Sequence, residues 1–511
     1  MKTPAKLLRD AIEAARQKVA PPQPVPNHDI AVLRRDQSGK VIGLKTPDGD
    51  DVDVVLVEKN LTGGIELSGS GAALKAIAPP PNFSWPFAQY PVKAYWAGDV
   101  AKCSIAPESL IDPACFAGVL YYVDFTNGSD TNNGTSWATA VKSIWKAISL
   151  GNATGAAYRV KVKAGTYPRA NSFTNNATVF PTQSVMLEAV GGRVVTGPFD
   201  SLTWAQDGTY TNTYSATRSN VQRVFDITAT DEFGNYAELT PVASATLCNT
   251  TPGSWYSDGT KLYVRRLDGA AVTNTNTRAY LQAGCAVHKE TGNHWYAKGF
   301  DLEGGTDQGV AYIYGNTGVP RRSVWVNCSA KYAGGAGNLL KNGFGALDFH
   351  GLVAFFGCIG NANTADGFNA HYTPGTGYCC LLTVGCTGFD NGRFTNQSNN
   401  GLTAHETVLA IDIGSEYGWN RGGTLRNIGT TQMWVVGSKI HDDQGDVSLG
   451  GAMTPTQVQV DNSAKLWMDS VVIYGGGTSL KAADTSAIYT RSVTEVGGSR
   501  SVAAGATIVA Y

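Results

Sequence analysis

One short pattern recurs in the segments VNCSA (326–330), FGCIG (356–360), VGCTG (384–388), IGSEY (413–417), VGSKI (436–440), MDSVV (468–472) and TRSVT (490–494). Its central Cys or Ser returns at intervals of 30, 28, 29, 23, 32 and 22 residues, and such spacings are typical of the coils of a solenoid. The first, third and fifth positions are apolar or small, which predicts strands that turn these positions inward. We therefore expect an internal row of Val326, Phe356, Val384, Ile413, Val436 and Met468.

A second pattern lies between those segments, in NGFGAL (342–347), DGFNAH (366–371) and NGLTAH (400–405). We interpret it as the second strand of each coil, in which the large apolar residue and the Ala two positions later point inward. The residue after each Ala then points to solvent, which predicts an outward row of Leu347, His371 and His405. The cysteines of the first pattern, Cys328, Cys358 and Cys386, are expected to pack in the core rather than to react.

The two patterns together predict a parallel β-helix, and the rest of the chain is divided around it. Residues 4–19 have apolar positions at helical spacing and precede a Pro-rich linker, which predicts a short helix. The four regions predicted are a head with this helix and a small β unit (1–60), a neck (61–118), the β-helix (119–498) and a C-terminal tail (499–511).

The start of the β-helix is marked by the strand YYVDF (121–125) and a turn-rich segment. A helix is predicted next, because four apolar residues stand at i, i+3, i+4 and i+7, namely Val141, Ile144, Trp145 and Ile148. It is expected to cover the first coil strand, YRVKVKAGTY (158–167), since the exposed end of a solenoid needs a cap. Strands are also evident in residues 198–298, but their coil register is not.

Three segments resemble known families. YYVDFTNGSDTNNGTSWATAVKSIWKAI (121–148), followed by VKVKAGTY (160–167), resembles the start of pectate-lyase-like right-handed β-helix domains, and GSWYSDGTKLYVRRLDG (253–269) resembles a segment of carbohydrate-active β-helix proteins. VLRRDQSGKVIGLKTPDG (32–49) resembles the virion-attachment head of bacteriophage tail spikes. The resemblance implies an all-β, right-handed parallel β-helix that forms a homotrimer, attaches to phage tail or baseplate proteins and binds bacterial capsule or lipopolysaccharide, often cleaving it.

Composition excludes several other classes of function. The chain has 511 residues and a formal net charge of −1, without a cluster of Lys or Arg, so neither nucleic acid nor an anionic membrane is an expected partner. No stretch approaches the roughly 18 consecutive apolar residues of a membrane span. Charged residues interrupt the apolar positions of the first 19 residues, so we expect synthesis in the cytoplasm without a cleaved signal peptide.

Coil stacking predicts one candidate catalytic site. Asp390 and Asp442 each lie four residues after the central residue of their segment, so they occupy equivalent positions two coils apart, roughly 9 to 10 Å. Carboxyl separations of about 6.5 to 9.5 Å suit inverting glycoside hydrolysis. Trp419, at the same offset on the middle coil, could stack on a sugar ring, and Glu416 could replace either carboxylate. For any single Asp, the alternative role is that of capping a turn.

The outward row of His371 and His405 is the second candidate, and it is expected to bind substrate together with Arg426, Arg393, Glu406 and Asp443. Asp366, beside this row, is a further catalytic candidate. Neutral bases, cations and carboxylates in one row could hold a charged sugar and support β-elimination. For each His, a surface or intersubunit hydrogen bond is the alternative. With no compact acidic triplet and no second His for a zinc-protease motif, no metal and no cofactor are predicted.

These observations favour a phage tail spike that cleaves a bacterial surface polysaccharide as an endo-glycosidase and acts from the virion at the cell surface. A non-catalytic adhesin with the same polar face is one alternative, and a polysaccharide lyase acting by β-elimination is the other.

Overall fold

The computed structural model describes residues 32–35, 41–45, 51–52, 75–173, 179–283, 286–289, 291–306, 309–335, 340–373, 375, 377–393, 399–445 and 454–511. The chain divides into two units, residues 1–74 and 75–511. The first contains a three-stranded antiparallel sheet of β1 (Val32–Arg35), β2 (Val41–Lys45) and β3 (Asp51–Val52). These strands fall within the β unit predicted for the head, and the predicted helix over 4–19 lies outside the described residues.

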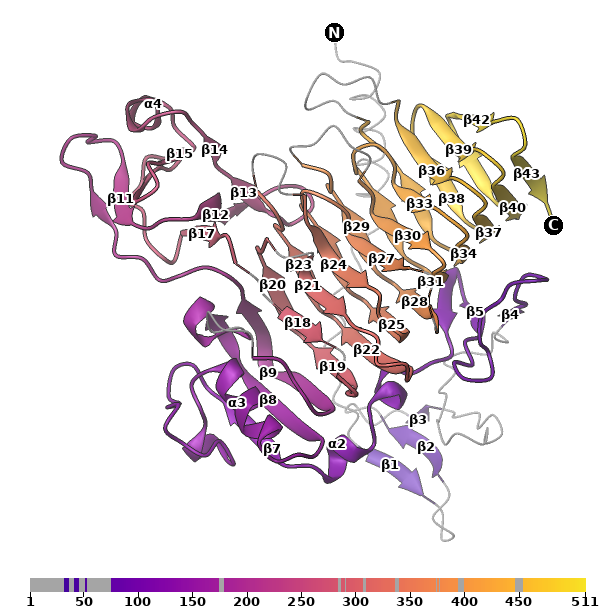
Figure 1. Cartoon of the computed structure of the whole chain (residues 1–511), viewed down its shortest axis with the longest axis horizontal. Helices are drawn as coiled ribbons and strands as arrows, with labels where there is room; N and C mark the ends of the chain where they lie inside the picture. Colours follow the sequence, from indigo (N-terminus) through magenta and orange to yellow (C-terminus); the bar gives the residue numbers. More distant parts are fainter. Residues whose placement is uncertain are drawn as a thin grey trace. The chain divides into compact units, whose positions relative to one another are not determined.

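The second unit is a parallel β-helix whose coils contribute three short strands each, and Figure 1 shows the strands of successive coils side by side. Sheet 1 consists of β18 (Ala286–Lys289), β21 (Gly309–Tyr314), β24 (Asn342–Leu347), β27 (Phe368–Tyr372), β30 (Leu402–Glu406), β33 (Leu425–Asn427), β36 (Thr456–Val460), β39 (Thr478–Ala482) and β42 (Ser499–Val502). Sheet 2 consists of β19 (Trp295–Lys298), β22 (Arg321–Val326), β25 (Gly351–Phe356), β28 (Cys379–Val384), β31 (Leu409–Ile413), β34 (Gln432–Val436), β37 (Lys465–Asp469), β40 (Ala487–Arg491) and β43 (Thr507–Ala510).

Sheet 3 follows sheet 2 in every coil. It consists of β20 (Phe300–Glu303), β23 (Ser329–Lys331), β26 (Ile359–Asn361), β29 (Thr387–Phe389), β32 (Glu416–Gly418), β35 (Lys439–His441), β38 (Val472–Tyr474) and β41 (Thr494–Val496). Residues 499–511 were expected to be a tail, but β42 and β43 pair in parallel with β39 and β40, so the coils continue to the last described strand.

The first coils are longer and are covered by a helix. They contain β7 (Leu120–Val123), β8 (Tyr158–Tyr167) and β9 (Val185–Thr196), which pair in parallel and lead into β19 and β20. Helix α3 (Ile144–Asn152) buries Ile144 and Ile148 in the same core as Val160 and Val162 of β8, as the predicted cap requires. The other helical turns of this part are η1 (Pro107–Leu110), α2 (Ala114–Ala117), η2 (Trp137–Thr139) and η3 (Arg169–Asn171). No helix of the described residues is long and apolar enough to cross a membrane.

The sequence predicted the sheet-1 register correctly. Phe344, Phe368 and Leu402 are paired in neighbouring strands and buried in the interior, and His371 pairs with His405 on the outward side. Alternation along an uninterrupted strand is sufficient for this prediction, because a residue at every second position faces the same way.

The predicted internal row that begins at Val326 is wrong. In the first five segments the second residue has a left-handed backbone, for example Asn327 with φ of 47° and Gly357 with φ of 59°. In the last two segments the third residue has it, Ser470 with φ of 52° and Ser492 with φ of 55°, so every segment bends between sheet 2 and sheet 3. The bend interrupts the alternation of a strand, and Val326 therefore points outward while Cys328 points into the core. The outward row pairs Val326, Phe356, Val384, Ile413, Val436 and Asp469, so Met468 does not belong to it.

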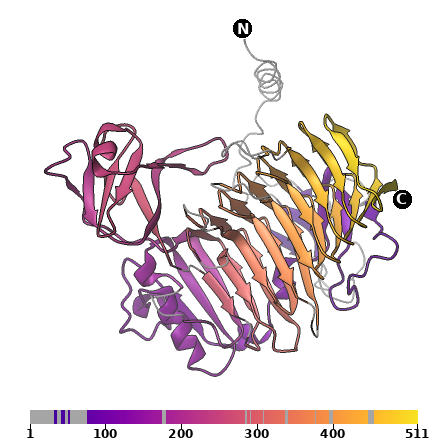
Figure 2. The ribbon, with the colours of Figure 1, turned by 45° about the horizontal axis from the view of Figure 1, so that its top comes forward.

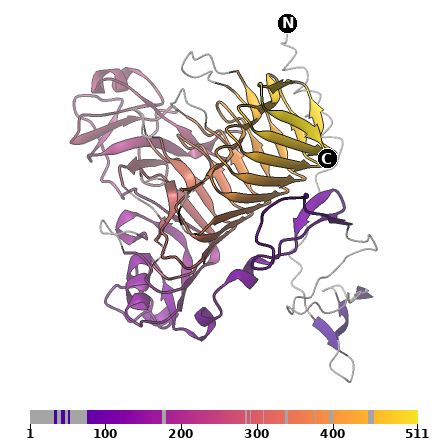
Figure 3. The same ribbon diagram turned by 45° about the vertical axis from the view of Figure 1, so that its right-hand side comes forward.

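The outward apolar row of sheet 2 is buried by residues 75–118, which the sequence left without a regular pattern. This segment contains an antiparallel sheet of β4 (Lys75–Ile77), β5 (Ala94–Ala97) and β6 (Val100–Cys103). Its Phe83 ring lies 6.2 Å from Trp434 and 5.6 Å from Trp467. Figure 3 shows β5 beside the coils. The described part of the predicted neck, residues 75–118, is therefore packed along the β-helix and closes a second hydrophobic core.

Residues 205–281 form a mostly antiparallel insertion between β9 and the second coil, which is why no coil register was visible there. One sheet contains β10 (Ala205–Gln206), β11 (Tyr214–Thr217), β16 (Lys261–Arg265), β15 (Ser254–Ser257) and β14 (Thr240–Pro241), and the other β13 (Tyr236–Glu238), β12 (Val221–Thr230) and β17 (Thr277–Leu281). Helix α4 (Ala245–Thr250) and a separate apolar core complete it. Figure 2 shows this insertion, in magenta, beside the coils.

Candidate functional site

Asp390, Trp419 and Asp442 occupy the same position on three consecutive coils. Each follows the last residue of its sheet-3 strand, and the parallel register pairs Phe389 with Gly418 and Gly418 with His441. All three have a left-handed backbone, with φ of 55°, 52° and 49°, which Asp adopts more readily than bulky residues do. The predicted register of these three residues is therefore confirmed.

A ladder of buried asparagines lies directly after these turn positions. Nδ2 of Asn363 donates to Oδ1 of Asn391 at 3.0 Å, and Nδ2 of Asn391 donates to Oδ1 of Asn420 at 2.9 Å. The backbone N–H groups of Asn363 and Asn391 donate to the same two oxygens. Because buried polar groups are costly unless they are hydrogen-bonded, the ladder holds the turns of successive coils in one register.

Asp390 is part of an ion-pair network between the coils and the insertion. Its carboxylate contacts Arg393 and lies 3.2 Å from Arg421, and its side chain is only 9% exposed. Nη1 of Arg393 also donates to Glu238 of β13 at 2.9 Å. Glu238 in turn accepts two hydrogen bonds, both at 2.7 Å, from the buried Arg223. The structure thus places Asp390 and Arg393 in a network of ion pairs that connects the coils to the insertion.

Glu416 and Asp442 are brought together by a residue that sequence reasoning missed, His441. Nε2 of His441 lies 3.2 Å from Oε1 of Glu416, and Nδ1 lies 3.2 Å from Oδ2 of Asp442. The imidazole is fully buried, whereas the two carboxylate side chains are 40% and 37% exposed. The arrangement presents two accessible carboxylates on opposite sides of one ring, a separation on the order of 8 Å and thus within the range of an inverting pair.

The charge of His441 follows from its neighbours. Burial alone would lower the pKa of His441, but its hydrogen bonds with Asp442 and Glu416 outweigh burial and raise the pKa above 6.5. Each ring nitrogen lies within hydrogen-bond distance of one carboxyl group, Nε2 of Glu416 and Nδ1 of Asp442. The buried imidazole therefore fixes the orientation of both carboxyl groups. The signal in the sequence was a His directly before Asp442, at the outward end of a strand.

Aromatic rings surround this arrangement. Trp419 meets the His441 ring edge to face at 4.4 Å and contacts Phe233 of the insertion at 4.7 Å. The Tyr474 ring is stacked on His441 at 4.4 Å, with 3° between the planes. Trp419 is partly exposed, so the carboxylates are bordered by flat apolar faces of the kind that stack on sugar rings.

The second predicted cluster lies on the outward side of sheet 1. The rings of His371 and His405 are stacked 3.8 Å apart, and Nδ1 of His371 lies 3.1 Å from Oε2 of Glu406. Burial, the neighbouring His371 and Arg426 lower the pKa of His405 to about 3, so this ring is neutral at physiological pH. Arg426 forms a 2.8 Å ion pair with Asp461, one coil further on. The structure thus brings His371, His405 and Glu406 together.

Asp366 and Asp443 are buried in turns of the backbone. Oδ1 of Asp366 accepts from the backbone N–H of Asn400 at 2.6 Å, and burial raises its pKa. Asp443 accepts backbone hydrogen bonds from Gly423 at 2.7 Å and Gly445 at 2.8 Å, and burial raises its pKa to about 6. Both carboxyl groups are thus buried and hydrogen-bonded to backbone N–H groups, whereas Glu416 and Asp442 are more exposed.

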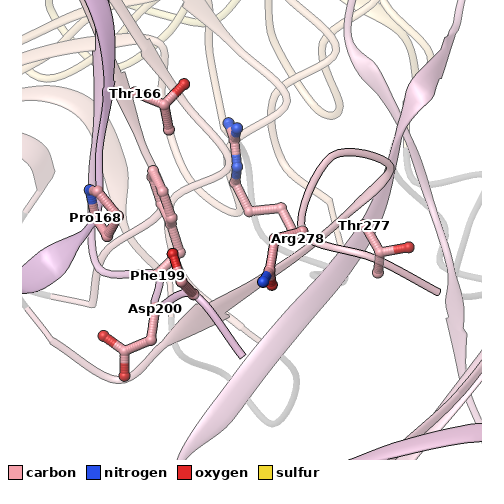
Figure 4. A pocket seen from close by; sticks show the side chains of 8 residues that line it. Thr166, Pro168, Phe199, Asp200, Thr277 and Arg278 are labelled. Carbon is pink, nitrogen blue, oxygen red and sulfur yellow. The ribbon is translucent and has the colours of Figure 1, made fainter. Parts of the chain in front are cut away.

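A small cavity lies between the first coils and the insertion, and Figure 4 shows its lining. Its volume is about 50 Å³, far below the roughly 300 to 1,000 Å³ of ordinary ligand pockets. Asp200 in its wall is paired with Arg169 and Arg218, both at 3.0 Å. A sugar ring does not fit there, so the exposed outer faces of the coils are the better candidates for a polymer.

No protein-family model matches the chain, and no curated protein matches it. Solved structures with similar folds include a protein described as a glycoside hydrolase, with 7% identity, a TM-score of 0.44 and coverage of 76% of this chain and 96% of the other. Pectate lyase Pel9A has 14% identity and a TM-score of 0.33, with 77% and 81% covered. The tailspike of Acinetobacter baumannii bacteriophage AP22, solved with capsular saccharide, has 9% identity and a TM-score of 0.26, with 72% and 76% covered.

Proposed function

We propose that this chain binds a bacterial surface polysaccharide along the outer face of sheet 3 and hydrolyses it with Glu416 and Asp442. The observation that carries the proposal is the pair of exposed carboxylates held on opposite sides of the buried His441. The aromatic rings of Trp419 and Tyr474 beside the pair support sugar as the ligand.

The chemistry follows from the separation of the two carboxyl groups. In inverting hydrolysis one group protonates the leaving oxygen, while the other removes a proton from a water molecule that attacks the opposite face of the sugar. The glycosidic C–O bond breaks as the new C–O bond to water forms; the acid passes its proton to the leaving oxygen, and the base takes one proton from the attacking water. His441 is buried and acts on Glu416 and Asp442 by holding them in place.

We further propose that the chain is the receptor-binding spike of a bacteriophage, attached through residues 1–60 to tail or baseplate proteins and active as a homotrimer. The support for this part is the resemblance of residues 32–49 and 121–167 to tail-spike and pectate-lyase-like sequences. A long, repetitive outer face also suits a long polymer, because each coil can contact a successive part of the chain.

In the experiment, the purified protein is incubated with capsule and lipopolysaccharide from a panel of bacterial hosts. Polymer size and ultraviolet absorbance are measured during the incubation. Hydrolysis predicts shorter polymer without new absorbance, and Glu416→Gln and Asp442→Asn should each reduce the rate at least a hundredfold. Shortening with new absorbance would identify a lyase instead and direct attention to His371 and His405. Binding without shortening on the correct host would contradict the enzymatic proposal and leave the adhesin.

A further inference from the structure

The cluster of His371, His405 and Glu406 on the outer face of sheet 1 is not used by the proposed hydrolysis. His371 and His405 are direct partners in β27 and β30, and Glu406 ends β30. One nitrogen or oxygen atom from each side chain can be chosen so that all three atoms lie within 4.8 Å of one another. Two neighbouring coils therefore supply three potential metal ligands to one point.

One of the two distances within the cluster matches that of two groups bound to the same metal ion, and the other is longer. Two ligands bound to one metal ion at about 2.1 Å, with an angle between tetrahedral and octahedral values, lie about 3.0 to 3.4 Å apart. His371 Nδ1 and Glu406 Oε2 are 3.1 Å apart, yet this oxygen has no hydrogen-bond donor of suitable geometry among the described residues. His405 Nδ1 lies 3.9 Å from Oε1 of Glu406, and its ring is stacked on that of His371, so metal binding requires the His405 ring to turn out of the stack toward the ion.

We propose that His371, His405 and Glu406 bind a divalent transition-metal ion such as Zn²⁺. Two imidazoles and one carboxylate suit Zn²⁺, Co²⁺ or Ni²⁺, whereas Mg²⁺ and Ca²⁺ prefer oxygen ligands. The side chains are 33%, 21% and 37% exposed, so an ion bound there keeps coordination positions open to water. Because the ligands come from two coils, binding also links these coils.

The backbone around Glu406 supports a fixed position for the third ligand. Glu406 has a left-handed backbone with φ of 58°, and its carbonyl accepts from the backbone N–H of Thr430 at 2.7 Å and from the Thr430 hydroxyl at 3.0 Å. A β-carbon on Gly429 would come within 2.7 Å of the Cα atom of Glu406, so the next coil packs tightly against this turn. The nearby charge of Arg426 is compensated by its ion pair with Asp461.

The test is titration of the full chain, without an affinity tag and after removal of metals with a chelator, by Zn²⁺ in a calorimeter. We expect one Zn²⁺ per chain, and we expect Glu406→Gln and His371→Ala to weaken its Kd at least tenfold. Zn²⁺ should also raise the Tm of the parent chain, because a ligand that binds only the folded state stabilises it. Mg²⁺ at the same concentration should leave the Tm unchanged.

Arg426→Gln is the matched control, because it alters the charge beside the cluster without removing a ligand atom, and it should keep the stoichiometry of one. Melting of each variant without metal shows whether it is folded. Absence of saturable Zn²⁺ binding to the parent chain, or an affinity that both ligand variants leave unchanged, would overturn the proposal. Neither result bears on hydrolysis, which is measured separately with Glu416→Gln.

Discussion

The imidazole of His441 lies in the space that Gly418 leaves on the neighbouring coil. A β-carbon on Gly418 would come within 2.4 Å of Cε1 and 2.6 Å of Nδ1 of His441. The two residues are direct partners in β32 and β35, so the missing side chain of one accommodates the ring of the other. The orientation of Glu416 and Asp442 thus depends on a glycine that carries no functional group.

Gly418→Ala is therefore expected to displace the His441 ring and to separate the two carboxylates from it. Overpacking of this kind costs about 1 to 3 kcal/mol, so we expect a folded protein with a lower Tm and at least a tenfold lower depolymerisation rate. Gly476→Ala is the control, because an added β-carbon there meets no atom within 4 Å. Equal loss of activity in both variants, or an unchanged rate in Gly418→Ala, would contradict the role of His441.

Asp390→Asn distinguishes a role of Asp390 in stability from a role in catalysis. Asn tolerates the left-handed backbone at this position, so the substitution removes mainly the negative charge between Arg393 and Arg421. Removing one partner of a buried ion pair costs on the order of 3 kcal/mol. We expect a lower free energy of unfolding in denaturant titrations, with the depolymerisation rate per folded molecule within twofold of the parent. A large loss of rate at unchanged stability would instead return Asp390 to the reacting pair.

The parts of the fold that sequence predicts best depend on regular alternation. The row of His371 and His405 was predicted because β27 and β30 each alternate without a break. The row that begins at Val326 was predicted with the wrong face, since one left-handed residue between two short strands reverses the alternation. A Gly or Asn at that position is compatible with either a strand or a bend, so composition alone did not decide between them.

The candidate site, too, was predictable from the sequence only where it depends on the repeat. The equivalence of Asp390, Trp419 and Asp442 follows from the repeat and was predicted, because register is a local property of each coil. Besides Asp390, Arg393 pairs with Glu238, which lies 155 residues earlier in an insertion of unrelated topology. Contacts of that kind depend on how the insertion packs on the coils, and the spacing of the repeat does not predict that packing.

Asn391→Ala tests whether the asparagine ladder stabilises the coils that position the site. The Asn391 amide donates to the Gly360 carbonyl and to Asn420, and its oxygen accepts from Asn363, so removal leaves several buried groups unpaired. An unpaired buried polar group costs about 1 to 3 kcal/mol, and we expect the free energy of unfolding to fall by more than about 3 kcal/mol. The exposed Asn133, whose Oδ1 accepts only in its own turn, provides the control, and Asn133→Ala should lose less than about 1 kcal/mol.

Asp412→Asn tests a carboxyl group enclosed within the coils. Its oxygens accept from Thr383 at 2.6 Å, Tyr417 at 2.9 Å and Ser438 at 2.5 Å, and burial raises its pKa above 3.8. The folded state therefore binds a proton more tightly than the unfolded state, so stability falls as the pH rises from about 3.8 through the folded pKa. Asn keeps the acceptor for Thr383 and Tyr417 and has no charge to bury. We expect the Tm of Asp412→Asn minus that of the parent to increase between pH 4 and pH 8 in thermal melts, and a difference that stays constant over this range would show that Asp412 is already ionised in the fold at pH 4.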